Sequence, residues 1–326
     1  MAAIRSSVPA CMLALCFLAG GCGMTVSIGM SGDCPTGVDC SPPTPQPAVQ
    51  VRPAHVTAQV GAAVSFETVL SNVDVVPAYR WSRSSDGGVT FADIAGATGP
   101  VYTLASATRA DDGTIFLVEV NSQNWRSFAT AQLVVSAVPP VVFQDGEFAL
   151  NEWDVVDDRS TLANEQVASG GNPGAFRRMS VQLVQPAGPS HVFHFARAAL
   201  YDPATQGAIY VIDFAEDGVL LECTDSAEVS SYPALEQSGR RYEGTNRIPD
   251  PFRLARQWGH EGAYASLTAR DFYQFDGPPC GTGEACPDFS AGAAPLRFGF
   301  LRIANAWVEG PVVHGIDNWR VAVWPR

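Results

Sequence analysis

The closing stretch of the chain, residues 314–324 (HGIDNWRVAVW), decides the fold. Within it the large apolar residues Trp319, Val321 and Val323 alternate with smaller or charged ones. Such alternation is the mark of a β-strand with one buried face. A strand that ends a chain in this way completes a sheet begun far upstream. We therefore expect one β domain over residues 138–326.

The segments that precede this strand have the same character. Apolar and β-branched residues gather in short runs, and glycine, proline and aspartate fill the joints between them. No stretch favours a helix of more than two turns. The pattern predicts an all-β sandwich, with strands at residues 176–184, 192–196, 207–214 and 297–303.

Length and charge narrow the possible classes of protein. The chain has 326 residues, which is more than one hydrophobic core usually holds, so two domains are expected. Its formal net charge is −13. An acidic surface repels phosphate backbones, which argues against a nucleic-acid partner.

The first residues predict export. An apolar run at residues 11–19 has the length of a signal peptide and is too short to span a bilayer. It leads into Leu-Ala-Gly-Gly-Cys22, which resembles a bacterial lipobox. The resemblance implies a signal peptide at 1–21, a lipid on Cys22 and an address at the cell envelope, facing the periplasm or the exterior. The alternative is an ordinary secretory signal with a structural cysteine.

The segment 22–47 is predicted to be a tether, because proline-dense sequences are extended and stiff. Two close cysteine pairs suit an oxidising compartment, and each can close a short disulfide loop. A zinc site is the alternative for the second of these pairs. That pair does not have the Cys-x2-Cys spacing usual for zinc, and no histidine lies nearby. The pairs are Cys34 with Cys40 and Cys280 with Cys286.

Residues 48–137 read as short strands separated by turn signals, and they resemble a bacterial immunoglobulin-like domain. Trp81 matches the tryptophan of the third strand. Phe66 and Val118 stand where this family often has its inter-sheet cysteines, and Phe116 replaces the corner tyrosine. The resemblance implies a sandwich held by apolar packing, acting as a spacer.

The C-terminal domain loosely resembles laminin-B-like and carbohydrate-binding jelly rolls. The residues that carry the likeness are 143–148, 170–174, 208–214 and 315–319. In such jelly rolls, acids of the last strand and near the first strand hold a structural calcium, which takes six to eight oxygens. The resemblance implies Asp317 with Asp145 and Glu147 as its ligands. Alternatively, Asp317 and Asn318 only hydrogen-bond backbone at a strand entry.

Sugar binding needs exposed aromatic rings beside fixed polar groups. Trp307, in a loop before the closing strand, is the first candidate. Tyr242, Trp258 and His260 form a second candidate group in another loop-rich region. The alternative is that these aromatic rings belong to the core.

Catalytic signals are weak. Glu152, Asp154 and Asp157 resemble the carboxylate strand of some sandwich glycosidases. Their spacing does not place all three on one face, and Trp153 and Val155 read as a core-facing pair. We expect a lipid-anchored, non-catalytic binding module for a glycan or a matrix component. A sandwich glycosidase and a purely structural envelope protein are the alternatives.

Overall fold

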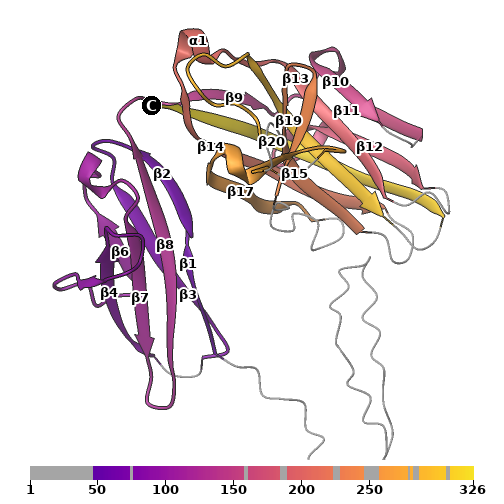
Figure 1. Cartoon of the computed structure of the whole chain (residues 1–326). Coiled ribbons are helices and arrows are strands. Elements are labelled where there is room, and N and C mark those ends of the chain that lie inside the picture. The colour runs from indigo at the N-terminus through magenta and orange to yellow at the C-terminus, as the bar shows by residue number, and fades with distance from the viewer. Residues whose placement is uncertain are drawn as a thin grey trace, which may run out of the picture.

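The computed structural model describes residues 47–73, 76–157, 161–183, 189–222, 228–245, 257–277, 280–281, 286–305 and 309–326. The described chain forms two β-sandwiches, which confirms the predicted all-β class (Figure 1). The predicted signal peptide and most of the tether, with Cys22, Cys34 and Cys40, lie outside these residues, as does Trp307.

Helix is confined to short pieces. In the described ranges these are α1 (Pro203–Gln206) and three single 3₁₀ turns, η1 (Arg109–Asp111), η2 (Leu150–Glu152) and η3 (Ala269–Asp271). None of the described helices is long and apolar enough to cross a membrane.

The first sandwich has the immunoglobulin-like arrangement of one small and one larger sheet. The small sheet is antiparallel, in the order β1 (Ala48–Arg52), β3 (Val64–Ser71), β6 (Val101–Leu104). The larger runs in the order β2 (His55–Gln59), β8 (Arg126–Ser136), β7 (Ile115–Asn121), β4 (Ala78–Ser84), β5 (Ala92–Asp93), with β2 parallel to β8.

Apolar packing holds these two sheets together, as predicted. Trp81 is fully buried, and its indole Nε1 donates to the Gly99 carbonyl at 3.0 Å. Phe66 and Val118 are also fully buried. The rings of Phe66 and Phe116 lie 4.9 Å apart, so the residue at one cysteine position packs on the residue at the corner position.

The second sandwich is larger, and its neighbouring strands pair antiparallel. One sheet has the order β10 (Trp153–Asp157), β13 (Ser190–Tyr201), β19 (Leu296–Asn305), β15 (Glu228–Gln237), β16 (Arg240–Gly244), β18 (Phe272–Gln274). The other has the order β11 (Thr161–Gly171), β12 (Gly174–Leu183), β20 (Gly310–Pro325), β14 (Ile209–Glu222), β17 (Gly259–Leu267), and β9 (Val141–Asp145) also pairs with β20. Figure 1 shows the two sheets as stacked layers.

Strand β20 pairs with strands from far upstream, as predicted, and it lies at the centre of its sheet. It pairs with β14 along one side, and with β12 and then β9 along the other. Its core face packs Trp319 edge-on against Trp153, with ring centroids 5.0 Å apart. The expectation of a single buried face is wrong, because Ala322 and Trp324 are buried as well.

The second buried face exists because the first sandwich covers this end of β20. Trp324 packs in a cluster with Val134 of β8 and Val211 of β14. Close by, the hydroxyl of Tyr210 donates to Asp112 of the first sandwich at 2.7 Å. The two sandwiches therefore share a packed junction as well as a connecting peptide.

Candidate functional site

A bend in β20 gathers polar side chains from two strands and a turn. Asn318 sits at the bend with a positive φ of 49°. Its Nδ2 donates to Asp217 Oδ2 of β14 at 2.6 Å and to the carbonyl of Asn172 at 2.5 Å. The Asn172 amide donates to Asp317 Oδ2 at 2.5 Å. We call Asn172, Asp217, Asp317 and Asn318 the bend cluster.

Glycine makes the close approach possible. The turn between β11 and β12 brings Gly171 against the bend. A Cβ on Gly171 would lie 2.6 Å from Asp317 Oδ2 and 2.5 Å from the carbonyl oxygen of Ala175. Any other residue would push the turn away, so a backbone without a side chain is required here.

Trp258 borders the bend cluster. Its indole Nε1 donates to the Gly170 carbonyl at 2.8 Å, next to Gly171. Its ring meets Phe176 edge to face, with centroids 5.3 Å apart. The residue that follows it, Gly259, pairs with Gly218 of β14. The side chain is partly exposed. Trp258, predicted as an aromatic platform, and Asp317, predicted as a calcium ligand, thus lie in one region.

The electrostatics of the bend cluster favour acceptance of hydrogen bonds. Asp317 is fully buried, and this burial raises the pKa of its carboxyl. The backbone amides of Asn172 and Asn318 lower that pKa, whereas the nearby charges of Asp217 and Glu147 raise it. The cluster therefore holds two buried carboxylates close together, and backbone amides fix the position of Asp317.

Of the calcium ligands predicted from the sequence, Glu147 lies close enough to Asp317 to raise its pKa, whereas Asp145 is occupied by other partners. Asp145 Oδ1 accepts from the backbone amides of Glu147 and Phe148, both at 2.8 Å, and Oδ2 accepts from the Trp153 indole at 2.6 Å. Its oxygens thus cap a turn and hold a core tryptophan. Among the described residues, no three His, Cys, Asp or Glu side chains are grouped to hold a metal. A structural calcium stays a prediction.

Tyr242 is not an exposed aromatic. It is 3% exposed and packs in the main core of the second sandwich, because its position on β16 faces inward. The prediction of a platform at Tyr242 is therefore wrong. His260 lies in β17, but its side chain is not among those described.

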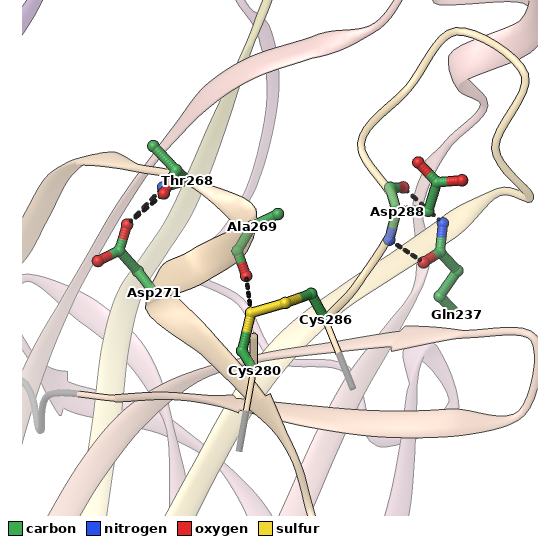
Figure 2. The surroundings of a disulfide bond; sticks show 7 residues. All are labelled: Gln237, Thr268, Ala269, Asp271, Cys280, Cys286 and Asp288. Atoms are coloured by element: carbon green, nitrogen blue, oxygen red, sulfur yellow. Dashed lines mark hydrogen bonds between the residues drawn. A yellow bond between two sulfur atoms is a disulfide. The ribbon is translucent and has the colours of Figure 1, made fainter. Parts of the chain in front are cut away.

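The Cys280–Cys286 disulfide is present, as predicted, with Cα atoms 4.7 Å apart (Figure 2). The segment beyond Cys286 is tied to β15, because Gln237 exchanges two 2.8 Å hydrogen bonds with the backbone of Asp288. The disulfide thus closes a short loop, and the hydrogen bonds of Gln237 hold the segment that follows it at the end of β15.

The two described carboxylates of the strand that resembles a glycosidase, Glu152 and Asp154, have different surroundings. Glu152 is exposed in the turn η2. Asp154 Oδ1 lies 2.7 Å from an Arg197 nitrogen, and Oδ2 pairs with Arg297. Trp153 is buried as expected, but Val155 is 37% exposed, so the predicted core-facing pair is wrong in its second member. The side chain of Asp157 is outside the described set.

Sequence reasoning missed Asp217 and Asn172. The predicted strand ended at residue 214, whereas β14 continues to Glu222. Its register with β20 slips between residues 215 and 217, and this irregularity delivers Asp217 to Asp317. Charged residues followed by glycine at 216–218 were the available signal, because they interrupt an apolar run.

Comparison with known proteins adds little. No family model and no curated protein matches the chain. A structure of the four N-terminal immunoglobulin domains of Dscam1 isoform 6.9 is 18% identical with a TM-score of 0.23, covering 27% of this chain and 20% of that one. A marsupial T cell receptor is 11% identical with a TM-score of 0.25, covering 46% of this chain and 94% of that one.

The chain thus spans only about a fifth of the Dscam1 structure. A structure described as the basis of T cell activation by toxic shock syndrome toxin-1 gives 18% identity and a TM-score of 0.22, covering 28% of this chain and 99% of that one. Overlaps this poor carry no argument about function. The assignment of immunoglobulin-like and larger β-sandwiches rests on the strand order itself.

Proposed function

We propose that the chain is a non-catalytic binding protein of the bacterial cell envelope. In this proposal the second sandwich binds a glycan at the bend cluster, and the first sandwich serves as a spacer. The observation that supports it is the partly exposed Trp258 ring beside carboxylate and amide groups held in place by backbone hydrogen bonds.

The chemistry suits a sugar. An aromatic ring packs on the C–H face of a pyranose, and fixed polar groups select its hydroxyls. The buried carboxylates of Asp217 and Asp317 hold the bend and the turn in place, while the more exposed side-chain amides of Asn172 and Asn318 supply both donors and acceptors. The same oxygens would attract a calcium ion, so metal-dependent binding belongs to this proposal.

Lipid attachment at Cys22 and the proline-rich tether would place the module away from the membrane surface. Both are proposals from the sequence. A lipid chain contributes about 0.8 kcal/mol of membrane affinity per buried methylene, and firm anchoring needs more than one chain.

The test is binding of the chain to a glycan array, first with calcium and then with chelator. We expect a hit that Trp258→Ala and Asp217→Ala each weaken at least tenfold. The matched control is Trp125→Ala, because Trp125 is also partly exposed but belongs to the first sandwich. Loss of the hit with chelator would assign a metal to the site.

No glycan bound in either condition would refute the proposal and favour the structural alternative. Equal losses in the Trp125 and Trp258 variants would show that the bend cluster is not the site. Turnover of a bound polysaccharide, abolished by Asp154→Asn, would replace binding by the glycosidase reading.

A further inference from the structure

A groove of about 900 Å³ lies where the two sandwiches meet. One wall comes from the β1–β2 segment, residues 50–57, with Ala129 and Thr130 of β8. The other wall comes from residues 213–215 of β14, Tyr264 and Ala265 of β17, and Arg320 of β20. Ligand sites are commonly found at domain junctions and have about this volume.

The groove is held in shape by hydrogen bonds that cross the junction. Asp213 Oδ1 accepts from the Thr57 hydroxyl at 2.8 Å and from the Ser266 amide at 2.7 Å. Asp213 Oδ2 accepts from the Trp324 indole at 2.7 Å. The hydroxyls of Thr57 and Ser266 lie 2.9 Å apart. This network joins β2, β14, β17 and β20, so the two walls keep a defined separation.

Most of the lining is apolar. Val56 lines the groove from the first sandwich, and Tyr264 and Ala265 line it from the second. Val51 and Phe214 also border the groove but belong to the two cores. An apolar body placed here would remove hydrophobic surface from water, worth about 25 cal/mol for each Å² buried.

The charged groups of the lining are mainly basic. Arg52 and His55 line it from the first sandwich, and Arg320 from the second. The one lining carboxylate, Asp213, already accepts three hydrogen bonds, and its burial raises its pKa. Guanidinium groups bind carboxylates in a bidentate manner. The local charge is therefore opposite to that of the acidic chain as a whole.

We propose that this groove binds an amphipathic organic anion, with its apolar body between Val56 and Tyr264 and its carboxylate on Arg320. The site is separate from the bend cluster and does not depend on glycan binding. Because each sandwich supplies one wall, such a ligand would also stabilise the junction between them.

The test is isothermal titration calorimetry of the full chain with decanoate and, as the neutral partner of equal length, 1-decanol. We expect saturable binding of decanoate. Arg320→Gln should weaken decanoate at least tenfold and leave decanol unchanged, since it removes the charged anchor only. Ala265→Trp should weaken both ligands, because the larger side chain fills the groove.

Leu200→Trp is the matched control for the added ring, because Leu200 is 54% exposed and does not line the groove. It should leave both affinities unchanged. A weak ligand would have a Kd on the order of 1 mM or below. Absence of saturable decanoate binding up to about 1 mM would therefore overturn the proposal. Decanoate binding that persists equally in Arg320→Gln and Ala265→Trp would overturn it too.

Discussion

An ion pair crosses the interior of the second sandwich, and breaking it should be costly. Arg302 of β19 and Glu216 of β14 have side chains that are 1% and 0% exposed. Arg302 Nη1 donates to Glu216 Oε2 at 3.2 Å and also to the Ser231 hydroxyl. The closer contact, Nη2 to Oε1 at 2.9 Å, is not aligned as a hydrogen bond. The guanidinium also packs 4.6 Å above the Phe300 ring.

The energetics follow from burial. Desolvation raises the pKa of Glu216 and lowers that of Arg302, and each partner's charge works against that shift. Removal of one partner leaves a buried charge without compensation, which costs about 3–5 kcal/mol. Arg302→Met should therefore lower the free energy of unfolding by that amount. The midpoint of thermal unfolding should fall by about 6–20 °C, since each kcal/mol corresponds to about 2–4 °C in a domain of this size.

The double variant Arg302→Met/Glu216→Leu is the decisive control. It replaces the pair by apolar groups of similar volume, and such replacements are often neutral or stabilising. We expect it to unfold within about 1 kcal/mol of the natural chain by urea denaturation followed by circular dichroism. The reasoning is refuted if the single substitution costs less than about 1 kcal/mol, or if the double variant is less stable than the single one.

The second sandwich also makes predictions for acid, for one glycine and for its disulfide. Burial lowers the pKa of His314 to about 3, and a buried arginine adds to the effect. His314 takes up a proton below about pH 6.5 in the unfolded chain but not in the folded chain. The free energy of unfolding, measured with urea, should therefore fall as pH drops from 6.5 toward 3, with about 1.4 kcal/mol per pH unit from His314, and His314→Gln should remove that part of the slope. Gly299→Ala should lower the free energy of unfolding by about 3 kcal/mol in calorimetry, because the added Cβ would lie 1.9 Å from a backbone oxygen of β13. The control is Gly292→Ala, where the added Cβ meets open space and the loss should be less than about 0.5 kcal/mol. Similar losses in the two variants would contradict this reasoning. Replacing both Cys280 and Cys286 by serine should lower the free energy of unfolding by only about 2 kcal/mol, because the disulfide closes a short loop. The double substitution should leave glycan affinity unchanged. A loss of glycan affinity would instead place this loop in the binding site.

Much of the fold could be read from the sequence because strand periodicity is local. Alternation at Trp319, Val321 and Val323 correctly predicts a core face, and all three are buried. The aromatic at Trp81 correctly marks the core of the first sandwich. The cysteine spacing correctly predicts the Cys280–Cys286 disulfide, because a short loop brings its ends together without help from the rest of the chain.

The site could be read only in part. Trp258 and Asp317 were predicted for separate purposes, and only the fold places them in one region. Their neighbour Asp217 was missed because a slip in strand register is set by the partner strand and leaves little trace in the sequence. Tyr242 was misassigned for a related reason, since a loop-like composition does not reveal which face of a short strand points inward.

The sequence alone determined the class of structure, the face of the closing strand and the short-range links, because these depend on residues a few positions apart. Only the tertiary structure decided which distant residues meet. The Arg302–Glu216 pair, the Asn318–Asp217 hydrogen bond of the bend cluster, and the contact of Trp324 with the first sandwich each join residues that are 86 or more positions apart. The two-residue period of a strand indicates which face each side chain occupies, but it does not indicate what covers that face.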